Sequence, residues 1–435
     1  MLTPAVAASS ARRSSGGGSR SAITQTLLRA DSTRYTVPLT VEASVGAGPG
    51  TSDQETLAIL LTGGGARAAY QVGYLRWIAQ HIPEINFPIL TGVSAGAINA
   101  AYLASCAGPQ AEAIERLTRL WRELTVDKVF RVDAPSLLGH VARWGVRLVS
   151  GGGVIAPQVR GLLDSAPLEK TLASGFRLTD DNREIDGIQQ RLESRSLSAL
   201  AVLTSNYGTG QSVIWIQGRD LPAWERPDRR SRRTKITLDH VLASSALPLF
   251  FPAVRLDGAW YGDGGIRLTA PCSPAIHLGA TRILALSTRY RAGLDEADRL
   301  TVQGYPPPLQ ISGQLLNAIF LDDLNSDARE LERLNALLRD LPPEKRRGLR
   351  QVQLMVARPS QDLGHMVAEY EPKLPRIFRH LTRGLGSRET TSPDILSLLA
   401  FDPGYLNALI DLGEADAATH EGEIRALLCP QVKAS

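Results

Sequence analysis

A serine framed by glycines, between an expected strand and an expected helix, constrains this sequence more than any other feature. Residues 87–91 (FPILT) are mostly apolar and indicate a short strand. The pentapeptide GVSAG follows, and residues 97–104 (AINAAYLA) are small and compatible with a helix. A strand that turns sharply into a helix through small residues exposes the serine hydroxyl at the tip of the turn. The pattern therefore predicts a nucleophile elbow, with Ser94 as the nucleophile between Gly92 and Gly96.

A second glycine cluster lies one expected strand earlier. Residues 57–61 (LAILL) form a continuous apolar run, as expected for a strand buried on both faces. The three glycines that follow let the backbone approach a ligand with its N–H groups exposed, which suits a phosphate or an oxyanion. The lysine of a phosphate-binding loop is missing. Because a candidate nucleophile follows one strand later, we predict an oxyanion hole formed by Gly63, Gly64, Gly65 and Arg67.

An aspartate followed by glycines lies far downstream. The Asp-Gly pair at 257–258 predicts a β-hairpin, whose second strand leads into Asp263, Gly264 and Gly265. Asp-Gly-Gly is also ordinary turn chemistry, but Asp263 is not needed to turn this hairpin. A serine needs a base to become a nucleophile, and a carboxylate can act directly or through a histidine. We therefore predict Asp263 as the base, in a turn shaped by the two glycines.

In this order, the motifs resemble those of the patatin-like phospholipases, a family of Ser–Asp acyl hydrolases. The run at 63–67 resembles the family's oxyanion loop, the pentapeptide around Ser94 its nucleophile elbow, and Asp263 with its glycines the dyad motif. Residues 243–252 (ASSALPLFFP) resemble the block that packs beneath the site. Residues 401–417 are similar to the closing segment of bacterial members.

The resemblance covers residues 55–420 and implies a three-layer α/β/α fold with a central, mostly parallel sheet. It also implies hydrolysis of a phospholipid or lysophospholipid ester by Ser94 and Asp263 through an acyl-enzyme, with no cofactor and no metal ion. Thr62 stands where the family usually has aspartate, and Ala68 where it usually has glycine. Both flank the expected oxyanion donors, so they bear on the conformation of that loop more than on the chemistry.

Two other functions are compatible with the same motifs. The chain order permits an α/β-hydrolase triad, in which His277, His365 or His380 would act with Ser94 and Asp263. None of these histidines lies in a glycine-framed turn. The second alternative is a non-catalytic lipid- or acyl-binding protein of the same fold, for which the two departures from the family pattern are the only hints.

Composition excludes several classes of protein. Of the 435 residues, 43% are hydrophobic and 21% are charged, as in a globular protein rather than a disordered one. The formal net charge of +4 gives no support to a nucleic-acid partner. Three cysteines are too few for a disulfide framework and fit a reducing compartment. We expect a cytoplasmic protein with transient, peripheral contact to a membrane surface.

The chain is expected to divide into four parts. Residues 1–50 should form a disordered tail, in which the arginines follow the mildly apolar stretch, so no signal peptide is expected. Strands that alternate with helices over residues 55–290 indicate the α/β catalytic core. Residues 291–420 should form a C-terminal helical extension packed on this core, and residues 421–435 a tail.

Two segments are candidates for contact with lipid. Residues 136–149 predict an amphipathic helix, followed by a glycine hinge at 151–153. Its apolar face consists of Leu137, Val141, Trp144 and Leu148. This helix could pack on the core or form a lid bordering the Ser94 cavity. The basic run at 226–235 could be a solvated loop or could attract anionic lipid.

Overall fold

The computed structural model describes residues 56–131, 161–179, 182–219, 223–293, 323–384 and 394–429, with isolated residues between 139 and 149 and between 305 and 315. All of them belong to one compact unit. The expected N-terminal tail and the expected hinge at 151–153 lie outside the described residues. So do the four residues that define the apolar face of the expected lid, Leu137, Val141, Trp144 and Leu148.

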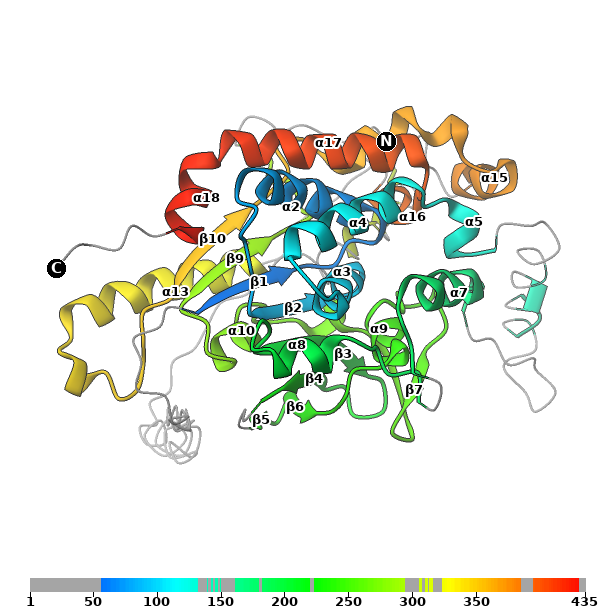
Figure 1. Cartoon of the computed structure of the whole chain (residues 1–435). Helices are drawn as coiled ribbons and strands as arrows, with labels where there is room; N and C mark the ends of the chain where they lie inside the picture. The colour runs from blue at the N-terminus through cyan, green and yellow to red at the C-terminus, as the bar shows by residue number, and fades with distance from the viewer. Residues whose placement is uncertain are drawn as a thin grey trace, which may run out of the picture. The chain divides into compact units, whose positions relative to one another are not determined.

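A mostly parallel sheet forms the centre of the molecule (Figure 1). Its strands are β1 (Leu57–Leu61), β2 (Ile89–Val93), β3 (Ala199–Asn206), β4 (Ser212–Gly218), β5 (Glu225–Arg226), β6 (Arg229–Arg233), β7 (Val254–Leu256), β8 (Ala259–Asp263), β9 (Arg282–Leu286) and β10 (Gln353–Ala357). The order is β10-β9-β1-β2-β3-β4-β6-β5, and β8 pairs with both β3 and β7. The five strands from β10 to β3 run parallel, whereas β4 and β8 run antiparallel to β3.

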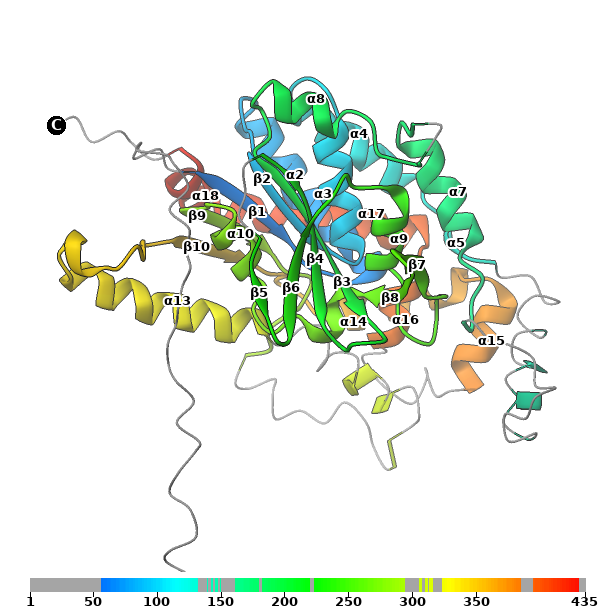
Figure 2. The same ribbon diagram turned by 90° about the horizontal axis from the view of Figure 1, so that it is seen from below.

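Helices lie on both sides of this sheet (Figures 1 and 2). The longer ones are α2 (Ala69–His81), α3 (Ala95–Ser105), α4 (Gln110–Arg122), α7 (Ala166–Gly175), α13 (Asp323–Asp340), α15 (Arg376–Gly384), α17 (Pro403–Thr419) and α18 (Glu421–Leu428). The shorter ones are α5 (Val126–Val129), α8 (Ile188–Glu193), α9 (Leu238–Ser244), α10 (Ser273–His277), α14 (Leu363–Met366) and α16 (Asp394–Leu399). Short 3₁₀ turns are η1 (Gly65–Ala68), η2 (Gly264–Arg267), η3 (Pro343–Lys345), η4 (Val367–Glu369) and η5 (Glu371–Lys373).

Alternate side chains of each central strand point into two separate cores, because successive residues of a strand face opposite sides of a sheet. In β1, Ile59 and Leu61 belong to the core that includes α2, α3, α4 and α17. Ala58 and Leu60 belong to the core that includes α10 and α13. All five residues of this strand are buried, which explains its continuous apolar sequence. The three-layer α/β/α fold expected from the sequence is confirmed.

The region after residue 290 is more than a helical extension. Its strand β10 pairs with β9 at the edge of the sheet, and its helix α17 packs along α2. A Cβ at Gly73 of α2 would meet the carbonyl oxygen of Ile410, and a Cβ at Gly413 of α17 would meet that of Tyr70. These glycines let the two helices pack at close range.

A helix also occupies part of the expected C-terminal tail. Helix α18 begins at Glu421, and its side chains Ile424, Leu427 and Leu428 are buried in the core that includes α17. The apolar spacing of these three residues gives the helix one face to bury. Residues 430–435, beyond it, lie outside the described residues.

Candidate active site

Ser94 lies at the sharp turn between β2 and α3, in a backbone conformation that L-residues seldom adopt. Its φ is 57° and its ψ is −132°, a combination that costs about 1–3 kcal/mol at a residue other than glycine. A Cβ at Gly92 would lie 2.5 Å from the carbonyl oxygen of Gly96, and a Cβ at Gly96 would meet that of Leu61. Both flanking glycines are therefore required by the tightness of this turn.

Ser244, at the end of α9, supports the turn from below. Its Oγ accepts a hydrogen bond from the backbone N–H of Ser94 at 3.0 Å and donates one to the carbonyl oxygen of Leu203 at 2.6 Å. Ser244 is completely buried, so water does not compete for these bonds. The sequence predicted that the block at 243–252 packs beneath the site, but it gave no sign of this hydrogen bond.

Asp263, the last residue of β8, is fully buried and lines the same cavity as Ser94. Its Oδ1 accepts the backbone N–H of Gly265 at 2.8 Å, whereas Oδ2 has no hydrogen-bond partner among the described residues. Burial raises the pKa of Asp263 to about 7, while the nearby Ser94 hydroxyl and the Gly265 N–H act in the opposite direction because they favour the carboxylate. A buried carboxylate oxygen thus remains available to accept a proton.

The two glycines after Asp263 have different roles. A Cβ at Gly264 would meet the carbonyl oxygen of Leu203, so this position packs directly against β3. Gly265 supplies the N–H that holds the carboxylate of Asp263. Both glycines are buried.

Two glycines of the expected oxyanion loop line the cavity beside Ser94. Gly64 has φ 152° and Gly65 has φ 54°, and neither N–H donates a hydrogen bond to another described group. Gly63 lies just outside the lining, where a Cβ would come 2.9 Å from the Ser94 Cβ. Its carbonyl oxygen accepts the hydroxyl of Thr288 at 2.6 Å, which holds the loop against the segment after β9.

Arg67 is buried, and its side chain binds α16 rather than the cavity. Its Nη2 lies 2.6 Å from Oδ1 of Asp394, and its Nε donates to Oγ of Ser397 at 2.6 Å. Arg67 is not among the described residues that line the Ser94 cavity. The structure therefore shows an anchor for the oxyanion loop, and the predicted contribution of Arg67 to the oxyanion hole stays a prediction.

The polar residue at position 62 is held by backbone groups. Thr62 Oγ1 donates to the carbonyl oxygen of Leu286 at 3.1 Å. Gln71 Nε2 donates to the carbonyl oxygens of both Thr62 and Leu286, at 2.8 and 3.0 Å. Asn99 Nδ2 donates to Gln71 at 3.3 Å, and Asn99 Oδ1 accepts the indole N–H of Trp121 at 2.8 Å. This buried network connects the start of the oxyanion loop to the cavity wall.

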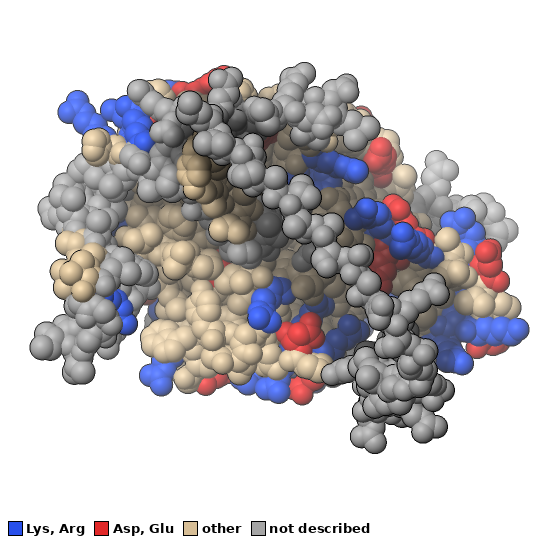
Figure 3. Space-filling view, turned by 180° about the vertical axis from the view of Figure 1, so that it is seen from behind, with Lys and Arg blue, Asp and Glu red and all other residues tan. Residues whose placement is uncertain are grey.

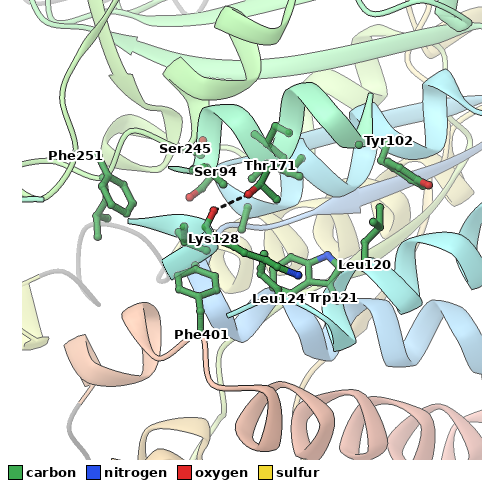
Figure 4. A pocket seen from close by; sticks show the side chains of 18 of the residues that line it. Ser94, Tyr102, Leu120, Trp121, Leu124, Lys128, Thr171, Ser245, Phe251 and Phe401 are labelled. Atoms are coloured by element: carbon green, nitrogen blue, oxygen red, sulfur yellow. Dashed lines mark hydrogen bonds between the residues drawn. The ribbon is translucent and has the colours of Figure 1, made fainter. Parts of the chain in front are cut away.

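The Ser94 cavity has a volume of about 480 Å³ and a mostly apolar lining (Figure 4). Ser94, Asp263, Gly64 and Gly65 supply its polar atoms at the turn. Its apolar wall comes mainly from α4, α5, α7 and the segments after α9 and α16, and includes Ile98, Tyr102, Leu117, Leu120, Trp121, Leu124, Val129, Leu168, Leu172, Phe176, Leu247, Phe251, Leu398, Leu399 and Phe401. The sequence motifs predicted the turn but not this wall.

The histidines considered for a triad lie elsewhere. No histidine is among the described residues that line the Ser94 cavity. His277 stacks on Trp224 with ring centroids 4.6 Å apart, and burial lowers its pKa to about 4. Within the described part of the chain, no three His, Cys, Asp or Glu side chains come together as metal ligands.

The basic run at 226–235 contains strand β6, which lies between β4 and the edge strand β5, and several of its charges are paired. Arg230 pairs with Glu225, Arg232 with Asp257 and Lys235 with Glu184, at 3.2, 3.3 and 2.9 Å. This run is therefore less available to anionic lipid than its sequence suggests. Among the described residues, no helix has the length and apolarity needed to cross a bilayer.

The comparison with known families shows which family the chain belongs to. A family model described as patatin-like phospholipase matches residues 59–276, which is half of the chain. The chain belongs to the patatin-like phospholipases. The matched region of this patatin-like chain runs from β1 to α10 and includes Ser94 and Asp263. No curated protein has a matching sequence.

Several solved structures are similar to this patatin-like chain at low identity. Human GIVD cytosolic phospholipase A2 in complex with methyl gamma-linolenyl fluorophosphonate is 15% identical, with 86% of this chain and 59% of that chain covered and a TM-score of 0.42. VipD from Legionella pneumophila is 12% identical, with 83% and 67% covered and a TM-score of 0.30. The type III effector protein ExoU is 15% identical, with 82% and 53% covered and a TM-score of 0.29. The chain thus spans 59% of the length of the first of these proteins.

Proposed function

We propose that this protein is a lipid acyl hydrolase of the phospholipase A or lysophospholipase type, with a Ser94–Asp263 dyad. One observation carries the proposal. The buried Oδ2 of Asp263, which has no hydrogen-bond partner among the described residues, lines the same cavity as the strained nucleophile-elbow serine. Membership of the patatin-like phospholipases supports a lipid substrate.

In the proposed first step, Ser94 Oγ attacks the carbonyl carbon of the ester while its proton passes to Asp263. The carbonyl oxygen gains a negative charge, and the free N–H groups of Gly64 and Gly65 donate to it. Each such donor contributes about 3 kcal/mol to stabilising the transition state. The tetrahedral intermediate then expels the alcohol, which takes the proton from Asp263 and leaves an acyl group on Ser94.

In the second step, water attacks the acyl-enzyme. Asp263 accepts a proton from this water, and the same two glycines again hold the oxyanion. The intermediate releases the fatty acid, and the proton returns to Ser94 Oγ, which restores the starting state. A carboxylate with a pKa near 7 is a better base for this work than one with the ordinary value of 3.8.

The lining of the Ser94 cavity supports a long acyl chain as the group that it binds. Leu117, Trp121, Leu124 and Phe176 offer apolar surface and few hydrogen-bond partners, which suits hydrocarbon and not a polar head group. The head group would lie toward solvent, and contact with a membrane surface would be transient. The absence of any histidine from the described lining favours the dyad over a triad.

Labelling with a fluorophosphonate that carries a long alkyl chain tests the proposal. We expect one covalent label on Ser94, found by peptide mapping, and none on the protein with Ser94→Ala. Ser245 lines the same cavity and gives the matched control, because its hydroxyl donates to the carbonyl oxygen of Val241 at 3.0 Å. Ser245→Ala should label as the wild type does. A folded protein without label would support the non-catalytic binding protein, and a label on Ser245 would contradict the assignment of the nucleophile.

Turnover provides the second measurement. The wild type should release fatty acid from a panel of phospholipids, lysophospholipids and neutral esters, and Ser94→Ala should release none from any of them. Alanine variants of His277, His365 and His380 should keep their activity. Loss of activity in one of them, with normal unfolding, would favour the triad.

A further inference from the structure

A second hollow lies on the other side of the sheet, between α13 and the edge strand β10. Figure 2 shows how these two elements lie relative to the rest of the sheet. It has a volume of about 470 Å³. We call it the arginine hollow, and it is lined by Arg291, Asn325, Ala328, Arg329, Leu331, Glu332, Asn335, Leu354, Val356 and Arg358. It shares no lining residue with the Ser94 cavity, and the proposed hydrolysis makes no use of it.

The three arginines of the hollow have no acidic partner in the described part of the chain. Arg358 donates to Oδ1 of Asn325 at 2.6 Å and to Oγ of Ser287 at 3.5 Å, which are both neutral groups. Arg291 and Arg329 make no ion pair with a described carboxylate, although many arginines of this chain do. Glu332 is the one acidic side chain in the described lining, so the local balance is positive.

Partial burial makes the positive charge of Arg358 costly, whereas Arg291 and Arg329 are exposed at the rim of the hollow. Arg358 is half-buried, and desolvation together with the guanidinium groups of Arg291 and Arg289 lowers its pKa. An arginine nevertheless stays protonated in a protein. A charge that is withdrawn from water and faces like charges destabilises its surroundings unless an anion compensates it.

The three arginines form a local cluster. In Figure 3, basic and acidic side chains stand side by side over the end of the molecule that carries α13. The surface of this region is therefore mixed in charge, and the unpaired arginines are not part of a broad basic face. Three guanidinium groups, with the side-chain amide of Asn325 beside them, suit the several oxygens of a phosphate group, since arginine forms paired hydrogen bonds with phosphate.

We propose that the arginine hollow binds a phosphate-bearing anion through Arg291, Arg329 and Arg358. The phosphate group is the shared chemistry of two sources, a small phosphorylated molecule in solution and the head group of an anionic phospholipid. This inference does not rest on the proposed hydrolysis.

Binding is measured with the full chain carrying Ser94→Ala, which prevents any hydrolysis of lipid. One arm titrates glycerol 3-phosphate by calorimetry. The other measures co-sedimentation with phosphatidylcholine vesicles, with and without phosphatidic acid. Binding in the first arm identifies a soluble ligand, and binding only to vesicles with phosphatidic acid identifies a lipid head group. Both results support the site, and no binding in either arm overturns it.

Substitutions then locate the binding. The double variant Arg291→Gln with Arg329→Gln removes two charges and no hydrogen bond between described residues. We expect the affinity to fall by about tenfold or more. Arg358→Gln should lower it similarly. The matched control is Arg333→Gln with Arg339→Gln, which removes two exposed charges from the same helix outside the hollow. An equal loss in the control would show attraction to overall charge and would overturn the proposal.

Discussion

The Ser94 cavity and the arginine hollow have nearly the same volume, about 480 and 470 Å³, but opposite linings. The first is bounded mainly by leucine and aromatic side chains, with Ser94 and Asp263 at one turn and a few charged or hydroxyl side chains, such as Lys128 and Thr171, elsewhere in its wall. The second is bounded by arginine and asparagine side chains around a small apolar base. Volume alone therefore says little about what a hollow binds, and the chemistry of its wall decides between a hydrocarbon chain and an anion.

The two hollows are connected through the segment that follows β9. Ser287 Oγ accepts a hydrogen bond from Arg358 of the arginine hollow. The next residue, Thr288, donates its hydroxyl to the carbonyl oxygen of Gly63 in the oxyanion loop. A separate function for each hollow requires that changes in one leave the other working, and the following predictions test that separation.

The largest expected effect comes from Asp263→Asn. An amide cannot accept the proton of Ser94, so kcat should fall by about a thousandfold. Binding of glycerol 3-phosphate to the arginine hollow should not change. Asp257→Asn, on the same hairpin, is the matched control, because its positive φ of 46° suits asparagine. A similar loss of kcat in the control would show that the hairpin, and not the carboxylate at 263, matters.

Arg67→Ala should destabilise the wall of the Ser94 cavity. It removes the buried partner of an ion pair and leaves the partly buried Asp394 without its cation, so the free energy of unfolding should fall by about 3 kcal/mol. Urea unfolding measures this change. Arg425→Ala is the control, since its pair with Glu421 is exposed and contributes about 0.5 kcal/mol or less. Unchanged stability together with lost kcat would instead support the predicted oxyanion role of Arg67.

Hydrolysis should depend on pH through the buried carboxylate. With a pKa of about 7 for Asp263, kcat/KM should rise about fiftyfold from about pH 5 to about pH 7 and then level off. Initial rates on a soluble ester measure this. A rise completed near the ordinary carboxyl value of 3.8 would contradict the assignment of the base.

The raised pKa of Asp263 also makes the stability of the folded protein depend on pH. Because the folded state holds this proton more tightly than the unfolded state, the wild type should lose stability as the pH rises from about 4 to about 7. Asp263→Asn should lack this loss. Thermal unfolding of both proteins at several pH values provides the comparison.

Leu124→Gln should have the smallest effect on hydrolysis, and this effect should be limited to esters with a long acyl chain. An amide in this partly buried position of the cavity wall would lose water without gaining a partner when hydrocarbon binds beside it, so kcat/KM should fall about tenfold for a long-chain ester. A short-chain ester and the affinity for glycerol 3-phosphate should be unaffected. Leu337→Gln is the control, because Leu337 is 64% exposed on α13. Equal losses for long and short esters would argue against an acyl chain in the Ser94 cavity.

The sequence predicted the parts of the site that depend on local geometry. The turn at Ser94 is specified by glycines where a Cβ would strike backbone, and the loop at Gly64 and Gly65 by glycines with positive φ. Such requirements leave glycines in a short stretch of sequence, where they are visible. The three-layer fold was predictable for a similar reason, since buried strands have continuous apolar sequences. These features were read from neighbouring residues alone.

The remaining parts depend on contacts between distant segments. Ser244 lies 150 residues from Ser94, and Asp394 lies 327 residues from Arg67. Nothing in the local sequence of Ser244 or Asp394 distinguishes it from an ordinary serine or aspartate on a helix. The sequence could not predict the arginine hollow either, because Arg329 on α13 and Arg358 after β10 come together only in the folded protein.

The strained backbone at Ser94 lowers the thermal stability of the protein, although the proposed reaction needs this serine. Glycine adopts φ 57° with ψ −132° without steric penalty, so Ser94→Gly should be more stable than the wild type by about 1 kcal/mol. A screen that selects variants for survival at high temperature, without asking for hydrolysis, would therefore favour the loss of this serine. A variant with a raised melting temperature should therefore be tested for reaction with a fluorophosphonate, which shows whether the nucleophile is still present.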